Sequence, residues 1–159
     1  MAEHAALSQM QSALRQSQQE LLALLHKADD AMLYRHLIDN EWTLAENLVH
    51  IAEAREFFIN ETRKALTSPD TPIGRTITDP HRVQNVREHG LDAREVIYDK
   101  LVASHVQLMQ QLEQISDADL QQPVNHVKFG RQTLGEFIEH FIVEHDQAHV
   151  RQASVLLAH

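Results

Sequence analysis

Apolar residues recur every three or four positions along four stretches of the chain, which is the spacing that places them on one face of an α-helix. In the first stretch, Leu7, Met10, Leu14, Leu21 and Leu25 form such a stripe. Only four glycines and four prolines occur in 159 residues, and long segments lack both. The pattern therefore predicts four amphipathic helices, over about residues 5–27, 42–66, 92–115 and 132–157.

Two of the predicted helices begin with the same short motif. Thr43 is followed three residues later by Glu46, and Thr133 by Glu136. In such a capping box, each of the two side chains satisfies a backbone donor at the start of the helix. The segments "TLAENLVH" and "TLGEFIEH" also share Thr-Leu-x-Glu-x-x-x-His. This agreement fits either a duplicated helical hairpin or two capping boxes that match by chance.

Two long connections separate the predicted helices. Residues 67–90, "TSPDTPIGRTITDPHRVQNVREHG", hold three of the four prolines, and residues 116–131, "SDADLQQPVNHVKFGR", hold Pro123 and Gly130. Connections of this length inside a compact domain are typical of a crossover or a functional lid. We therefore expect an all-α fold, a four-helix bundle with long crossover connections, formed by a single domain over residues 1–159.

Charge and composition narrow the classes of function. The net charge of −9, from 14 basic and 23 acidic residues, leaves no basic stripe for a phosphate backbone, so we expect no nucleic-acid partner. Cysteine is absent, which excludes disulfides, thiolate nucleophiles and cysteine-ligated zinc. The chain shows no leader pattern and no apolar run of membrane-spanning length, so we expect a cytoplasmic protein without a membrane partner. Twelve histidines are the unusual count, and they point to imidazole chemistry.

Three histidines are candidates for one metal site. His145 and His149 are four residues apart, so on a helix they lie on one face, about 6 Å apart along the axis. His50 belongs to the second predicted helix, and facing helices of a bundle can bring one histidine to a pair on another. Three neutral imidazoles suit zinc, nickel, copper or ferrous iron and leave positions open for water or substrate. The alternative for His50 is a solvated position on the flank of its helix, which periodicity does not exclude.

The remaining histidines are expected elsewhere. His140 precedes His145 by five residues, about 140° around a regular helix, so we expect it at the surface, at an interface or beside the site. His105 falls in step with the apolar stripe of its helix and is a candidate substrate-binding residue facing the bundle interior. The others lie at chain ends or in links, where most should be solvated: His4, His26, His36, His81, His89, His126 and His159.

Two other metal motifs fit the sequence poorly. The segment "HDQAH" resembles the zinc-protease signature H-E-x-x-H, but Asp146 replaces the glutamate, and Val155 occupies the position of the third histidine in the extended motif. A di-iron carboxylate bundle requires Glu-x-x-His pairs, and none occurs on the predicted helices. A single-ion histidine site therefore fits better.

Two motifs together resemble the DinB-like, or damage-inducible, superfamily of four-helix-bundle metalloproteins. "EWTLAENLVHIAEAREFF" is similar to the family's W-[ST]-x-x-E-x-x-x-H-[IL] second helix, and "EHFIVEHDQAHVRQ" to the H-x4-H-x3-H-x-x-Q pattern of its fourth. The resemblance covers nearly the whole chain. It implies a divalent ion, often zinc or nickel, on His50, His145 and His149, and a homodimer. Arg151 stands where the family frequently has glycine, a departure that removes no ligand.

The resemblance also implies a function, since characterised members include bacillithiol-type S-transferases, mycothiol-dependent isomerases and proposed metal-dependent hydrolases. The first hypothesis is an enzyme whose ion lowers the pKa of a low-molecular-weight thiol or of water, for attack on a small electrophilic substrate. Glu53 and Gln152 are candidates for orienting groups or proton acceptors in it. The alternative is a non-catalytic bundle that holds a structural ion or sequesters a small molecule. Three histidines with open positions favour the enzyme.

Overall fold

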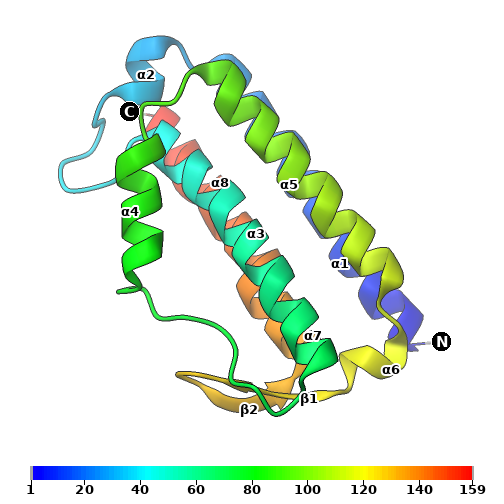
Figure 1. Cartoon of the computed structure of the whole chain (residues 1–159). Helices are drawn as coiled ribbons and strands as arrows, with labels where there is room; N and C mark the ends of the chain where they lie inside the picture. Colours follow the sequence, from blue (N-terminus) through cyan, green and yellow to red (C-terminus); the bar gives the residue numbers. More distant parts are fainter. Residues whose placement is uncertain (1, 159) are drawn as a thin grey trace.

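Four long helices form the core of the computed structural model, which describes residues 2–158 without the side chains of residues 2–5 (Figure 1). The first three are α1 (Ala2–Lys27), α3 (Leu44–Thr67) and α5 (Arg94–Gln114). The last has three parts: α7 (Leu134–Ile138), the π-helical turn η1 (Glu139–Val143) and α8 (Glu144–Leu157). The shorter elements are α2 (Asp30–Tyr34), α4 (Pro80–His89), α6 (Asp117–Leu120), β1 (Pro123–His126) and β2 (Gly130–Thr133).

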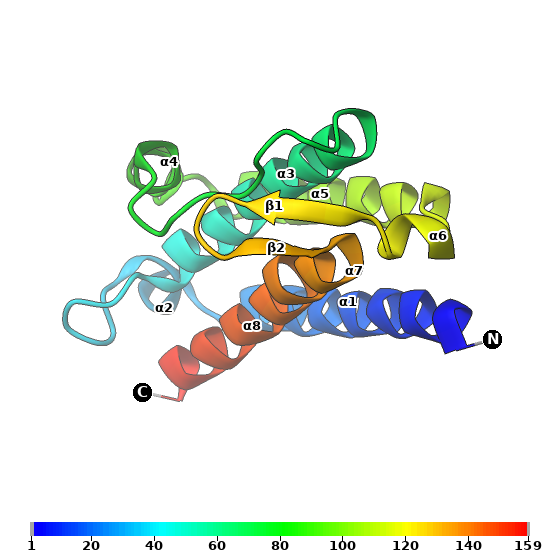
Figure 2. The same cartoon turned by 90° about the horizontal axis from the view of Figure 1, so that it is seen from below.

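The bundle does not have a simple up-and-down topology. α3 packs against α5 and runs in the same direction, because the crossover that contains α4 returns the chain to the end of the bundle where α3 began (Figure 1, Figure 2). α1 packs against α5 and α8, and α8 packs against α3. The predicted four-helix bundle with long crossover connections is confirmed. Within the described residues, no helix is long and apolar enough to cross a membrane.

Both predicted capping boxes are present. The Thr43 hydroxyl accepts a hydrogen bond from the Glu46 N–H at 3.0 Å, and the Thr43 N–H donates to the Glu46 carboxylate at 2.8 Å. Thr133 and Glu136 form the same pair of bonds at 3.1 and 3.0 Å. The two boxes set the first residues of α3 and of the last helix, which are the helices that carry the candidate metal ligands.

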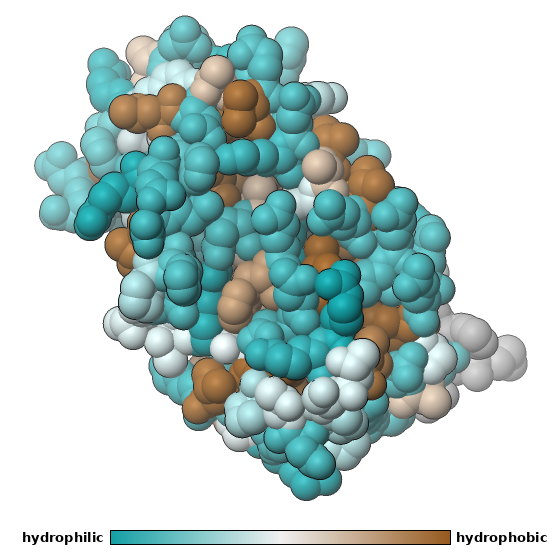
Figure 3. All heavy atoms as spheres, viewed as in Figure 1, coloured by the Kyte–Doolittle hydropathy of each residue, from teal (hydrophilic) through white to brown (hydrophobic). Residues whose placement is uncertain are grey.

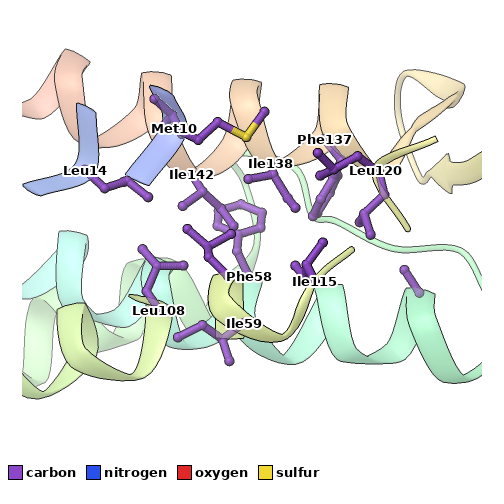
Figure 4. Close-up of a cluster of buried hydrophobic side chains, with 14 of the residues drawn as sticks. Met10, Leu14, Phe58, Ile59, Leu108, Ile115, Leu120, Phe137, Ile138 and Ile142 are labelled. Atoms are coloured by element: carbon purple, nitrogen blue, oxygen red, sulfur yellow. The ribbon is translucent and has the colours of Figure 1, made fainter. Parts of the chain in front are cut away.

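Apolar side chains between the helices form two clusters. Figure 4 shows the cluster near the hairpin formed by β1 and β2. In this cluster Phe58 of α3 meets Ile138 of the last helix and Leu108 of α5. The second cluster includes Leu21 and Leu48. On the face seen in Figure 3, apolar side chains appear only as separate patches among hydrophilic ones. Burial of the apolar stripes between the helices is therefore the main stabilising contribution to the bundle.

A buried ion pair joins α3 to α8. The Arg55 guanidinium donates to the Asp146 carboxylate at 2.7 and 3.1 Å, and both side chains are 1% exposed. Arg55 also donates to the Leu101 carbonyl oxygen at 3.1 Å and to the Ser104 hydroxyl at 3.2 Å, both on α5. Because the charge is paired and the donors are used, its burial is tolerated. These bonds hold three helices in one relative rotation.

The hairpin is tied to the crossover by backbone hydrogen bonds. β1 and β2 are antiparallel, with Pro123 opposite Thr133. The Ile73 N–H donates to the Asn125 carbonyl oxygen, and the Ile73 carbonyl accepts from the Val127 N–H, both at 2.9 Å. Residues from the first link and the tip of the second are therefore held side by side.

His126 is buried, and so departs from the expectation that most histidines at chain ends and in links are solvated. Its side chain is 3% exposed. Its Nδ1 accepts the N–H groups of Lys128 and Phe129 at 3.0 and 3.2 Å, and its ring stacks on Phe141. Gly74, at φ 89°, lies against the other side, where a Cβ would come within 2.3 Å of the histidine Nε2. The ring closes the hairpin turn, a role that linear spacing does not reveal.

The other link histidines behave as their positions suggest. Three are exposed, as predicted: His26, His36 and His81. His89 is half-buried and lies 2.9 Å from the Asp92 carboxylate. The predictions for His4 and His159 fall outside the described side chains.

Replacing Asp146 with alanine leaves the Arg55 guanidinium buried without a counter-charge. We predict that the free energy of unfolding, measured by urea denaturation, falls by about 3–5 kcal/mol. The control is Asp30→Ala, which removes the 85% exposed partner of Arg94 and should lower the same quantity by at most about 1 kcal/mol. Equal losses in the two variants would contradict a structural role for the buried pair.

Replacing Gly74 with alanine places a Cβ against the His126 ring. Gly130 is a matched control, because its φ of 76° is also positive while nothing lies within 4 Å of a Cβ built there. In both variants the new alanine must adopt the left-handed conformation, which lowers the free energy of unfolding by about 1–2 kcal/mol. We predict a further loss of about 1–3 kcal/mol in Gly74→Ala alone, from overpacking, in urea denaturation. Identical unfolding curves for the two variants would show that the contact does not restrict the ring.

Candidate metal centre

His50 of α3 and His145 and His149 of α8 lie together, and one ring nitrogen from each falls within 4.8 Å of the others. The Nε2 atoms of His50 and His145 are 3.1 Å apart. The ring centroids of His145 and His149 are 4.5 Å apart, as the four-residue spacing on one helix requires. The fold thus brings together the three residues that spacing selected. Their role as metal ligands stays a prediction.

The nitrogen positions fit a small divalent ion. Two imidazole nitrogens, each about 2.0–2.1 Å from a tetrahedral zinc ion, lie about 3.3 Å from each other. The observed separation between the Nε2 atoms of His50 and His145 is close to this, at 3.1 Å. Two neutral rings that face each other in this way can share at most one N–H, while a third nitrogen points into the same space. A cation there would accept all three lone pairs.

Two of the rings are oriented by contacts on their outer side. The His149 Nδ1 lies 3.1 Å from the Asn47 side-chain oxygen, and the Asn47 amide nitrogen donates to the Thr43 carbonyl at 3.0 Å, which fixes the amide orientation. The His50 Nδ1 lies 3.6 Å from the Glu53 carboxylate. The Asn47 oxygen at hydrogen-bond distance favours the His149 tautomer that carries its proton on Nδ1, and the nearby carboxylate charge of Glu53 favours the same tautomer of His50. The Nε2 lone pair is then free for a metal ion.

Burial lowers the pKa of all three histidines below the usual 6.5. The pKa of His149 falls to about 3, first through burial, then through repulsion from His50 when that ring is protonated, and then through the charge of Arg82. For His145 the pKa lies well below its usual value, again through burial and then through the other two histidines. The imidazoles are therefore neutral at pH 7, which is the form that binds metal ions.

A π-helical turn, Glu139–Val143, precedes the histidine pair. In a regular α-helix, the three four-residue steps from Phe137 through Phe141 and His145 to His149 would rotate the side chain by roughly 120°. The wider π turn takes up part of this rotation. The structure accordingly stacks Phe58 against Phe141 and also brings it to His145, at centroid distances of 5.8 and 6.3 Å. The predicted helix is thus continuous, but not regular.

Glu53 lies between His50 and Arg75. Arg75 donates two hydrogen bonds to its carboxylate, one of them at 2.7 Å. Although burial raises the pKa of Glu53, the hydrogen bonds from Arg75 and the nearby His50 ring outweigh this effect and hold the pKa at about 2. The carboxylate is therefore ionised and held in place, an arrangement better suited to orienting His50 than to accepting a proton.

The other predicted residues lie around this centre. Gln152 donates to Glu41 at 3.3 Å and lines two grooves, one with Arg151 and the other with His149. His105 is half-buried on α5, where burial lowers its pKa to about 4, and it does not line the cavity over the three histidines. His140 is exposed and lies 2.9 Å from the Glu144 carboxylate. Neither His105 nor His140 belongs to the cluster.

A cavity of about 270 Å³ opens over the three histidines. Aromatic rings form part of its wall, supplied by Phe58, Phe129 and Phe141. Its charged lining residues are Arg75, Arg82 and Lys128. The first link contributes both arginines, and the hairpin tip contributes the lysine and Phe129. The candidate ligands therefore lie at the bottom of an open pocket of small-molecule size.

Sequence reasoning missed the pocket residues that come from the links. Arg75, Arg82, Lys128 and Phe129 follow no helical periodicity, so the apolar pattern could not assign them to a face. The one available signal was that both links are long and carry basic and aromatic side chains, since long loops frequently carry binding residues.

Comparison with solved structures finds several proteins with a similar fold. YfiT from Bacillus subtilis, described as a probable metal-dependent hydrolase with an unusual four-helix bundle topology, is 17% identical with a TM-score of 0.79, over 94% of this chain and 85% of that one. The mycothiol-dependent maleylpyruvate isomerase is 16% identical with a TM-score of 0.74, over 91% of this chain, which spans only 59% of the isomerase. At these identities the likeness shows the fold alone.

A third similar structure is the colibactin self-resistance protein ClbS in complex with double-stranded DNA, at 15% identity and a TM-score of 0.73, over 95% of this chain and 94% of that one. No curated protein matches the sequence. The family comparison is direct, because the sequence profile of the DinB superfamily matches residues 13–153. With its bundle topology and its three clustered histidines, the chain belongs to the DinB superfamily.

Proposed function

We propose that the protein is a metal-dependent enzyme in which His50, His145 and His149 hold one divalent ion, zinc or nickel. The observation that carries this proposal is the convergence of three neutral imidazoles at the bottom of an open cavity. When bound, such an ion acts as a Lewis acid that lowers the pKa of a thiol or of water. The proposed reaction is attack of a low-molecular-weight thiol on a small electrophilic substrate.

The cavity favours a catalytic ion over a structural one. Structural zinc usually has four protein ligands, whereas the cluster has three members among the residues that the structure describes. The remaining coordination positions would face the cavity, where a thiol or substrate can enter. The non-catalytic bundle remains the alternative proposal if no reaction depends on the ion.

The surrounding side chains have supporting roles in this proposal. Asn47 and Glu53 orient the rings of His149 and His50 through their Nδ1 atoms. Phe129 and Phe141 exclude water from one wall of the cavity. Arg75 keeps Glu53 ionised and away from the reacting groups.

Metal-dependent hydrolysis is the second candidate, supported by the description of the similar protein YfiT. Among the described lining residues of the cavity, however, none is a carboxylate that could accept a proton from water. A free thiol such as cysteine has a pKa near 8.5, so it requires much less lowering than water to ionise at pH 7. This difference leads us to propose thiol transfer first.

We also propose the partner, the oligomeric state, the location and the domain organisation that the sequence led us to expect. The partner is a small molecule rather than nucleic acid, in line with the net charge of −9. The protein acts as a homodimer in the cytoplasm, and residues 1–159 form one domain. These statements remain proposals.

The metal site is tested first by measuring metal content with mass spectrometry on untagged protein. We expect about one divalent ion per chain in the wild type and its loss in His50→Ala and His149→Ala. The matched control is His140→Ala, because His140 is an exposed histidine of the same helix paired only with Glu144. A wild type that contains no ion and takes up none on titration would overturn the proposal. So would a His149→Ala variant that retains a full complement.

The reaction class is tested with metal-loaded protein and two substrates. We predict that conjugation of a thiol panel (glutathione, bacillithiol and mycothiol) to an aryl chloride, followed by absorbance, proceeds with the wild type and drops at least about a hundredfold in His149→Ala. Hydrolysis of a nitrophenyl ester without thiol should stay at the background rate. The reverse result would favour the hydrolase, and no ion-dependent rate in either assay would favour the non-catalytic bundle.

A further inference from the structure

The charged side chains that line the cavity are all basic, although the chain as a whole carries a net charge of −9. They are Arg75, Arg82 and Lys128. Three cations around one small cavity form a local excess of positive charge in an acidic chain. The distribution therefore bears on what the cavity binds.

Arg75 is already neutralised. It donates two hydrogen bonds to the Glu53 carboxylate, and its guanidinium lies 4.3 Å from the centre of the Phe57 ring. Its side chain is only 7% exposed. Arg75 is thus a fixed part of the cavity wall and leaves Arg82 and Lys128 as the available cations.

Arg82 is half-buried, and its guanidinium forms no ion pair with an acidic side chain among the described residues. One guanidinium nitrogen donates to the Ile77 carbonyl at 3.2 Å, and the group lies 4.8 Å from the centre of the Trp42 ring. Glu41 and Arg82 line one groove, but no ion pair joins them among the described residues, and Glu41 accepts from Gln152. A guanidinium has five N–H donors, so most of those on Arg82 remain available beside the histidines.

The proposed ion would add to this positive charge. Three neutral imidazoles do not cancel the charge of a divalent cation, and no carboxylate lines the cavity among the described residues. Half-buried, unpaired positive charge is unfavourable unless an anion neutralises it. The Glu53 carboxylate beside His50 is already paired with Arg75. The remaining positive charge therefore points to an anion supplied by a ligand.

The mouth of the cavity is apolar. Ile77 and Phe129 line it and are 74% and 63% exposed, which is high for such large apolar side chains. Lys128 lies beside this wall, with its ammonium group 5.3 Å from the centre of the Phe129 ring. The cationic and apolar surfaces are therefore adjacent.

We propose that the substrate is a small molecule with a carboxylate or phosphate group next to an apolar or aromatic group. Arg82 binds the anionic group, Lys128 assists at the mouth, and the apolar part packs on Ile77 and Phe129. This inference rests on the proposed function, because it names the substrate class of the same cavity. It makes Arg82 the main determinant of specificity.

The test is calorimetric titration of full-length, metal-loaded protein with three probes of similar size: benzoate, phenyl phosphate and benzamide. We expect one or both anions to bind at least about tenfold more tightly than neutral benzamide, and their ranking identifies the preferred group. Arg82→Gln should raise the Kd of the preferred anion by about ten- to a hundredfold, the range for a charge-assisted hydrogen bond, and leave benzamide unchanged. Lys128→Gln should act in the same direction by a smaller factor.

The matched control is Arg87→Gln, which removes the same charge from an exposed position on the same helix. An anion Kd that changes equally in Arg82→Gln and Arg87→Gln would overturn the inference, as would anions that bind no better than benzamide. If Arg82→Gln does not fold, as judged by circular dichroism, Lys128→Gln against Arg87→Gln decides the same question.

Metal content measured on the same samples separates this inference from the proposed function. Protein that holds its ion but shows no dependence of anion binding on Arg82 rejects the substrate class and leaves the metal centre standing. Protein that holds no ion rejects the metal centre, and titration of that metal-free protein still reports whether Arg82 binds the anion.

Discussion

The buried ion pair between Arg55 and Asp146 is the constraint on which the candidate metal centre depends. Asp146 directly follows His145 in the chain, and Arg55 lies five residues after His50. One pairing, with both side chains 1% exposed, therefore sets how α3 and α8 are rotated and aligned along their length. Any other alignment would leave a charge buried without its partner, which is strongly unfavourable. In the observed alignment, the Nε2 atoms of His50 and His145 are 3.1 Å apart.

The Arg55–Asp146 pair also explains why "HDQAH" contains an aspartate. Its aspartate replaces the glutamate that serves as the general base in the zinc-protease signature. In this fold, Asp146 turns away from the histidines toward Arg55, so it is a structural group. The acidic residue that does contact the centre is Glu53, on the other helix, and it is paired with Arg75. The charges close to the histidines are thus arranged to orient rings.

Helices and links contribute different parts of the candidate site. Helices supply the three histidines, because rigid elements can hold ring nitrogens in one place. The crossover and the hairpin supply the walls, including Arg82 and Phe129, and they are joined to each other through the backbone of Ile73. His126 closes the hairpin turn and stacks on Phe141, so the cavity wall and the core share one aromatic stack. Changes in the links can therefore alter the lining of the cavity without disturbing the histidines.

The sequence by itself determined the four helices, both capping boxes and the placement of His145 and His149 on one helix face, because these features are local. That His50 meets this pair was decided by the tertiary structure, since 95 residues separate it from His145. Apolar periodicity, a Thr-x-x-Glu motif and a four-residue spacing all act within a few turns of one helix. Only the tertiary structure decided the burial of His126, the π turn before His145 and the basic lining of the cavity. Each depends on residues far apart in the chain, such as Gly74 against His126. The spacing of residues along the chain does not predict such contacts, because side-chain packing and the pairing of buried charges form only when the helices come together.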